Sequence, residues 1–328
     1  MRNVSASSGV GKRLRSRSLL TLVAVAVLAI VVVQTFPRLS NAVGQASKLP
    51  APTWPWILLA MSAIAGSYWL SARALQVALG ARLPMRRTVL VQLAAAVANR
   101  LTPGSVGGVA INVRYLTNLG YGVGESGAAV AATGMTHVLV AVLGLTLFGP
   151  AVLSRDASNV VSWFGGWWLW LTLGAIALGG VAAYVVRRRR RQPAREGWLR
   201  SAIRDGLRAM RALSAQPGRV AKLMLYVGGV KAANLLALYA ALWSFDGDVA
   251  GWRVAVAYLV GATSAEAIPT PGGLGAVDAA LFFGLAGTAG SSAGAVLAGV
   301  VVYRLLAFWA PIVPGAVGSA FLRRRAVL

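Results

Sequence analysis

The chain has 328 residues, of which 57% are hydrophobic and only 12% are charged. Soluble domains carry about 25% charged residues, so this composition excludes a water-soluble enzyme and predicts an integral membrane protein. The chain has no cysteine, one histidine and eight acidic residues, which excludes disulfides and predicts neither a metal site nor a cofactor.

The net charge of +24 is concentrated at the ends of apolar runs. Four segments hold 24 of the 32 lysines and arginines: residues 1–18, 73–87, 187–222 and 323–328. This is the pattern of the positive-inside rule, in which basic residues stay on the cytoplasmic side of a membrane. It argues against a nucleic-acid partner and predicts a multi-pass protein of the cell membrane with both termini in the cytoplasm.

Six predominantly apolar runs are long enough to cross about 30 Å of hydrocarbon. In chain order they cover residues 19–36, 55–79, 123–148, 167–186, 220–243 and 292–322. The first follows the basic tail 1–18 and is predicted to be a retained signal anchor, with cleavage near Ser40-Asn41-Ala42 as the alternative. Eight of the eleven tryptophans lie at the span ends opposite the basic clusters, where indole rings prefer the membrane interface.

The linker at residues 187–219 begins with five adjacent arginines. Within it, residues 195–216 place leucines, an isoleucine and a methionine at every third or fourth position between arginines. That period predicts an amphipathic helix. Two interpretations stay open: a helix lying on the anionic cytoplasmic leaflet, or a solvated connection between two halves.

Two further apolar stretches contain pieces too short to cross the membrane. Residues 88–120 must begin and end on the cytoplasmic side, and they break at Thr102-Pro103-Gly104-Ser105. Residues 253–287 must begin and end outside, and they break at Thr270-Pro271-Gly272-Gly273. Proline interrupts a helix and glycine permits a turn, so each stretch predicts a hairpin that enters and leaves by the same face. In lipid, such a break survives only inside protein or beside a wet cavity.

The two breaks align, because Pro103 and Pro271 are 168 residues apart and the same offset superposes the flanking spans. The chain therefore divides into repeat A at 55–149 and repeat B at 220–322, each a span, a hairpin and a span. An outer loop with the fourth span (150–186) and the linker join them, and a basic tail (323–328) follows. The predicted fold class is an all-α polytopic membrane protein with about six full spans plus two re-entrant broken-helix hairpins arranged as an inverted repeat. Such repeats indicate a transporter with a central site.

Ionisable groups near the bilayer centre cost roughly 2.5–3.5 kcal/mol or more each, which marks them as candidates for function. Five such groups lie on the predicted spans and hairpins: Arg114, Lys231, Glu266, Asp278 and Arg304. The helices that begin after the breaks, at Val106 and Ala276, would offer free N–H groups and a partial positive charge to an anion. The alternative is that the acids only pair with the cations. His137 is more typical of a hydrogen-bonded structural histidine.

Around the two breaks the sequence resembles the transmembrane region of lysylphosphatidylglycerol synthases, also called the flippase-like family. The resemblance covers about residues 55–322. It is carried by Leu101-Thr102-Pro103-Gly104-Ser105-Val106-Gly107-Gly108 with Asn112 and Arg114, by Pro271-Gly272-Gly273-Leu274-Gly275 with Asp278, and by Tyr303-Arg304-Leu305 with Pro311 and Pro314. Many relatives have glutamate in place of Asp278, a second glycine in place of Ser105 and an acid in place of Val109.

The family's synthase members carry a separate soluble aminoacyl-transfer domain that no segment of this sequence resembles. The resemblance therefore implies the translocating part, which moves a lipid between leaflets. The predicted substrate-binding residues combine both motifs with the buried charges: Thr102, Pro103, Gly104, Gly107, Gly108, Asn112, Arg114, Lys231, Glu266, Thr270, Pro271, Gly272, Gly273, Gly275, Asp278 and Arg304.

The first hypothesis is a transporter, and not an enzyme, that moves an anionic or charged-headgroup lipid, such as a phospholipid or a polyprenyl phosphate. No ATP-binding P-loop is present in the sequence, so the predicted driving force is a gradient or downhill flow. One alternative is a membrane glycosyl- or lipid-modifying transferase that uses Glu266 or Asp278 as its base. The other is a scaffold subunit whose hairpins merely pack. The sequence does not predict the oligomeric state.

Overall fold

A computed structural model describes residues 51–102, 106–155, 208, 211–213, 215–247, 249–267, 276–286 and 293–324. Throughout this part of the chain, every regular element is a helix. The elements are α2 (Trp54–Leu79), α3 (Met85–Leu101), α4 (Val106–Asn118), α5 (Val123–Arg155), α8 (Pro217–Trp243), α9 (Gly251–Ala267), α10 (Ala276–Ala286), α11 (Ala293–Arg304), the π-helix η4 (Leu305–Trp309) and α12 (Ile312–Arg324). The all-helical class predicted from the sequence is confirmed for these residues.

Four helical stretches are long and apolar enough to cross a membrane: Trp54–Leu79, Val123–Phe148, Pro217–Trp243 and Gly294–Leu322. They match the predicted spans 55–79, 123–148, 220–243 and 292–322 within a few residues. The predicted spans 19–36 and 167–186 lie outside the described residues, as do the tail 1–18 and most of the linker. The described part of the chain therefore has four candidate membrane-spanning helices, as expected of a membrane protein.

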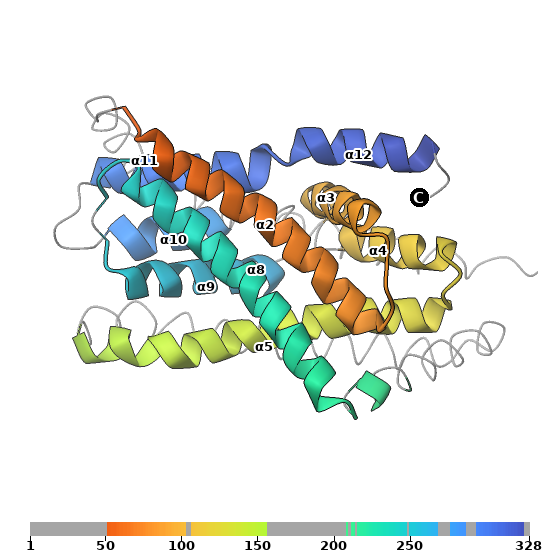
Figure 1. Cartoon of the computed structure of the whole chain (residues 1–328). Helices are drawn as coiled ribbons and strands as arrows, with labels where there is room; N and C mark the ends of the chain where they lie inside the picture. Colours follow the sequence, from red (N-terminus) through yellow and green to blue (C-terminus); the bar gives the residue numbers. More distant parts are fainter. Residues whose placement is uncertain are drawn as a thin grey trace, which may run out of the picture.

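The structure is built on α2 and α8, which lie side by side and antiparallel (Figure 1). At one end of the pair, the Thr53 amide donates a hydrogen bond to the Ser244 carbonyl over 3.0 Å. At the other end, Arg219 Nε donates to the Val77 carbonyl over 2.7 Å. The two long helices thus stay in register over their whole length, because both ends are tied.

The short helices form two antiparallel hairpins, α3 with α4 and α9 with α10. The second hairpin packs into a first core with the amino-terminal half of α2, the carboxy-terminal half of α8 and α11, around residues such as Ile64, Leu242 and Leu281. The first hairpin packs into a second core with the other halves of α2 and α8 and with Leu322 of α12. The α2–α8 pair therefore carries one hairpin core toward each of its ends.

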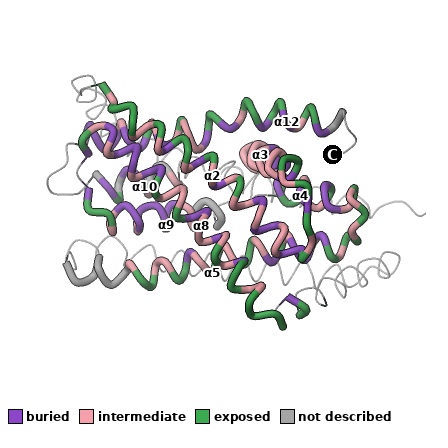
Figure 2. Tube along the Cα trace, viewed as in Figure 1, coloured by how far each residue is buried: buried purple, intermediate pink, exposed green. Residues whose placement is uncertain are grey.

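Large apolar side chains remain exposed on the outside of these cores. On α12, Val313, Val317 and Phe321 are exposed, and on α5 a stripe from Met135 to Leu147 is exposed as well. Figure 2 shows the contrast between α12, along which most residues are exposed, and α9, whose described residues after Gly251 are buried or intermediate. In a membrane protein, these faces are the ones that contact lipid.

Each hairpin is also held by the last span of the other half of the chain. Gly315 of α12 lies so close to α3 that an added Cβ atom would stand 2.8 Å from the Leu93 carbonyl oxygen and 2.6 Å from a methyl of Val97. Reciprocally, a Cβ added at Gly144 of α5 would stand 2.8 Å from a methyl of Leu259 in α9. Small residues permit this close approach of helices in membranes.

The last span departs from the continuous helix predicted over 292–322. It consists of α11, the π-helix η4 and α12, with a turn at Ala310 and Pro311. The physical reason is Pro311, which has no N–H and so leaves the Ala307 carbonyl without its α-helical donor. In the widened turn, the Ala310 amide instead donates to the Leu305 carbonyl over 2.7 Å.

We expect Gly315→Ala to destabilise the protein by about 1–3 kcal/mol, because the new methyl meets a backbone oxygen that has little room to move. Thermal unfolding of the detergent-solubilised protein measures this as a lower midpoint. Gly134→Ala is the matched control, since Gly134 also lies in a spanning helix but has nothing within 4 Å of an added Cβ atom. Equal midpoints for the two variants would contradict the close packing of α12 on α3.

Candidate functional site

The first hairpin is closed at its break by the side chain of Asn99 in α3 and that of Thr102, the residue that follows α3. Thr102 Oγ1 accepts a hydrogen bond from the Gly107 amide over 2.9 Å, while donating to the Ala98 carbonyl. Asn99 Oδ1 accepts from the Gly108 amide over 2.6 Å. The first turn of α4 therefore has partners for two of the N–H groups that a helix start leaves unpaired.

The two glycines are required by this close contact. A Cβ atom at Gly107 would stand 2.6 Å from Thr102 Oγ1, and one at Gly108 would stand 2.5 Å from Asn99 Oδ1. These contacts correct one sequence-based expectation. The start of α4 was predicted to offer free N–H groups to an anion, but the Gly107 and Gly108 amides are already bound within the protein.

Asn112 closes the hairpin further along. Its amide nitrogen donates to the Gly108 carbonyl over 2.9 Å, and its oxygen accepts from Gln92 Nε2 over 2.9 Å. One step beyond, the Thr88 and Tyr115 hydroxyls form a buried hydrogen bond of 2.9 Å. Asn112 is only 9% exposed. In this structure its polar atoms are used to hold α3 against α4.

Arg304 lies at the end of α11, with its guanidinium carbon 5.3 Å from the centroid of the Phe308 ring. A second arginine, Arg100 in the last turn of α3, lies against the same ring at 5.0 Å. Arg100 Nη2 also donates to the Ala307 carbonyl over 2.9 Å. This is the carbonyl that Pro311 deprives of its helical donor, so Arg100 replaces the missing backbone N–H.

Arg100 is not among the site residues predicted from the sequence, because it lies between the apolar run that ends at Asn99 and the motif that begins at Leu101. The one feature of the sequence that points to Arg100 is its position, three residues before Pro103 at the break of the first hairpin. Its partner could not be foreseen, because Ala307 is 207 positions away along the chain.

Lys231 lies in the middle of α8 and is only 7% exposed. His137 of α5 is close enough for the charge of Lys231 to act on it. The structure thus places the buried Lys231 and His137 near each other on the packed spans α8 and α5. Neither span contributes a residue to the cluster of Arg100, Phe308 and Arg304. Lys231 was predicted from its depth alone, and its burial agrees with that depth.

The remaining predicted residues fall into two groups. Arg114 is exposed on α4, whereas the adjacent Tyr115 and Leu116 are fully buried. The structure therefore leaves Arg114 outside the packed cores, and no described contact joins it to Arg304 or Lys231. A second group lies outside the residues or side chains that the structure describes: Pro103, Gly104, Glu266, Thr270, Pro271, Gly272, Gly273, Gly275 and Asp278.

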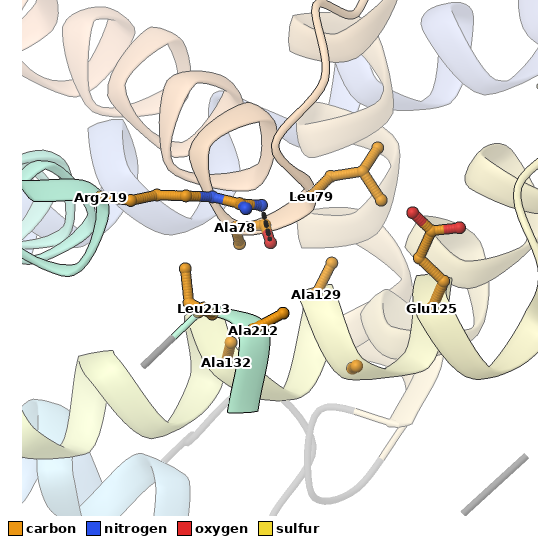
Figure 3. Close-up of a pocket in the computed structure, with 9 residues that line it drawn as sticks. Ala78, Leu79, Glu125, Ala129, Ala132, Ala212, Leu213 and Arg219 are labelled. Carbon is orange, nitrogen blue, oxygen red and sulfur yellow. Dashed lines mark hydrogen bonds between the residues drawn. The ribbon is translucent and has the colours of Figure 1, made fainter. Parts of the chain in front are cut away.

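A small cavity of about 150 Å³ lies where α2 ends and α5 and α8 begin. Figure 3 shows Arg219 reaching across its upper edge to the Ala78 carbonyl, while Glu125 faces the cavity from α5. Gly80, the residue that follows α2, has a left-handed backbone with φ +79, and an added Cβ atom there would collide with the Arg219 guanidinium. Arg219 thus caps the carboxyl end of α2. None of the predicted site residues lines this cavity.

In a comparison with known protein families, the family described as the lysylphosphatidylglycerol synthase TM region matches residues 14–315, which is nearly the whole chain. A comparison with curated protein sequences gives no match.

We expect Thr102→Val to loosen the start of α4, because valine keeps the shape of threonine but leaves the Gly107 amide without its acceptor. Loss of a buried partner costs about 1–3 kcal/mol. Hydrogen–deuterium exchange of a peptide covering Gly107 and Gly108 should therefore become faster by about tenfold or more. Thr146→Val is the control, since the Thr146 hydroxyl only donates to the carbonyl three residues earlier on an exposed face. Unchanged exchange in Thr102→Val would show that the hairpin break is closed in some other way.

Proposed function

Because the chain belongs to the family of the lysylphosphatidylglycerol synthase transmembrane region, we propose that it is a flippase-like transporter of membrane lipids. Its substrate is a lipid with an anionic or otherwise charged headgroup, such as a phospholipid or a polyprenyl phosphate. The headgroup crosses between the hairpins while the hydrocarbon chains stay in the bilayer. In this proposal the protein is not an enzyme, and membrane lipids are its partners.

One observation carries this proposal: the two hairpins belong to cores toward opposite ends of the antiparallel α2–α8 pair. In Figure 1, α3 and α4 lie in the right half of the view and α9 and α10 in the left half. Two hairpins entering from opposite faces is the arrangement expected of an inverted repeat with a central site.

The order and packing of the helices support the same reading. Repeat A has a long helix of 26 residues, short helices of 17 and 13, and a final span. Repeat B has a long helix of 27 residues, short helices of 17 and 11, and a final span. The packing is reciprocal as well, since α12 contacts α3 while α5 contacts α9. A pseudo-two-fold axis that relates repeat A to repeat B would explain both the matching helix lengths and the reciprocal contacts.

Lys231 and Arg304 are the groups that would bind an anionic headgroup in this proposal. Lys231 is buried in the middle of a span, and Arg304 lies at the break of another. Placing a cation at such depth in the membrane costs roughly 2.5–3.5 kcal/mol or more. Such residues are therefore expected where they bind a negatively charged group. A negatively charged headgroup would meet them on its way between the leaflets.

The orientation that we propose places the protein in the cell membrane with its basic ends in the cytoplasm. The chain contains no cysteine, so single cysteines can be introduced without other changes. We expect Ala215→Cys and Gly122→Cys to react with a membrane-impermeant maleimide only after the cells are opened, and Ala250→Cys to react on intact cells. All three positions are exposed. Labelling of Ala215→Cys and Ala250→Cys from the same side would exclude the proposed topology.

The transport proposal is tested in liposomes that contain fluorescent lipids with anionic or zwitterionic headgroups. We expect the purified protein to accelerate exchange of an anionic lipid between leaflets, and Asp278→Asn and Lys231→Gln to slow it by about tenfold or more, equivalent to at least 1.4 kcal/mol. Arg86→Gln removes an exposed charge at the end of the bundle and serves as the control. Exchange no faster than in empty liposomes across the lipid panel would favour a scaffold. Covalent change of a lipid would favour a transferase.

A further inference from the structure

Arg100 carries polar groups that its surroundings leave unused. Nη2 is bound to the Ala307 carbonyl, but Nε and Nη1 are buried and have no hydrogen-bond partner among the residues that the structure describes. A guanidinium cannot lose its proton at any physiological pH, so the charge and its donors persist. Two buried donors require a hydrogen-bond acceptor, and a permanent cation requires a counter-charge. A negatively charged acceptor supplies both.

Arg304 adds a second positive charge at the same place. Its guanidinium and that of Arg100 each lie about 5 Å from the centroid of the Phe308 ring, so the two charges are within about 10 Å of each other. Like charges this close repel each other strongly where water is scarce. Attraction of each guanidinium to the Phe308 ring offsets part of this repulsion. An anion between the two arginines would attract both of them and turn the net interaction of the cluster favourable.

The two arginines come from separate elements of the fold. Arg100 closes α3, immediately before the break of the first hairpin, and Arg304 closes α11, immediately before the π-helix η4. An anion held by both must present oxygens in more than one direction. Phosphate does so, and guanidinium groups bind it through paired N–H···O contacts.

The surface around the cluster is apolar and exposed. Leu305 is 51% exposed and Trp309 is 55% exposed, on the same five-residue π-helix that carries Phe308. Val106 and Val109, just beyond the hairpin break, are exposed as well. Half-buried cations beside exposed apolar side chains match an amphiphile, whose charged group enters while its chains remain in lipid.

We propose that Arg100 and Arg304, joined by Phe308, form a binding site for the phosphate group of a lipid. The proposal rests on the proposed transport function and deepens it, because it names the chemical group that is recognised and adds Arg100 to the residues that hold it. Arg100 offers the N–H of either Nε or Nη1 to the phosphate while Nη2 keeps the break at Ala307 closed.

Binding is tested directly on the purified protein by native mass spectrometry, with phosphatidylglycerol, with diacylglycerol as the lipid without phosphate, and with inorganic phosphate as the anion without chains. We expect phosphatidylglycerol to bind at least about tenfold more tightly than diacylglycerol. Arg100→Gln should remove most of this difference, and Arg100→Lys should restore part of it. Arg253→Gln is the control, because Arg253 also lies 5.0 Å from an aromatic ring, that of the neighbouring Trp252, but at the start of α9.

The two sources of phosphate are separated by competition. Displacement of phosphatidylglycerol by millimolar inorganic phosphate would show that the phosphate group alone is recognised. Failure of inorganic phosphate to compete, with binding still dependent on Arg100, would show that the chains are needed too. Equal affinities of wild type and Arg100→Gln for phosphatidylglycerol would overturn the proposal and leave Arg100 as a structural tie.

A measurement on the wild type covers the case in which Arg100→Gln does not fold. Phosphatidylglycerol, but not diacylglycerol, should slow hydrogen–deuterium exchange in peptides covering residues 305–310, and no difference between the two lipids would overturn the proposal. Leaflet exchange is then measured on the same samples. Phosphate-dependent binding without exchange would remove the transport function and keep the site. Exchange that is unaffected by Arg100→Gln, together with unaffected binding, would remove the site and keep the function.

Discussion

Inside a membrane, every backbone group that a helix break sets free must find a partner within the protein, and this constraint shapes both described breaks. At the first, Thr102 and Asn99 take the amides of Gly107 and Gly108. At the second, Pro311 leaves the Ala307 carbonyl without a donor, and Arg100 supplies one from another helix. Side chains at the carboxyl end of α3, including its C-cap Thr102, thus complete the backbone at both places.

The same constraint separates residues that hold the fold from residues that remain able to bind. Thr102, Gly107 and Asn112 belong to a motif that suggests substrate binding, yet their polar atoms are used within the hairpin. A group already committed to two hydrogen bonds has little left for a headgroup. Arg100 differs, because one nitrogen closes a break while two others have no described partner.

Much of the fold could be predicted from the sequence, because spans and hairpins follow from local properties. Run length and basic flanks located α2, α8 and the apolar part of α5 within a few residues, although α5 continues to Arg155, and the Pro-Gly break at residues 103 and 104 separated α3 from α4. The tertiary partners could not be predicted this way. Nothing local to Arg100 indicates Ala307 or Phe308, and the π-helix results from Pro311 together with the packing around it. Lys231 and Arg304 were found from their predicted depth alone, since a charged residue in the middle of an apolar span is conspicuous.

The packing also decides which parts of the chain can move together. α12 of repeat B lies against α3 of repeat A, with Gly315 in contact with the Leu93 carbonyl, and Arg100 ties α3 to the π-helix just before α12. Gly144 of α5 makes the reciprocal contact with Leu259 of α9. Rocking of one repeat against the other as sequence units would have to separate all of these contacts. Rocking of α3, α4 and α12 against α9, α10 and α5 keeps them, because each group contains a hairpin together with the span from the opposite repeat. Such rocking would have to slide α4 along α5, since these two helices also pack together in the second core. The α2–α8 pair, tied at both ends, then lies between the two groups as their common axis.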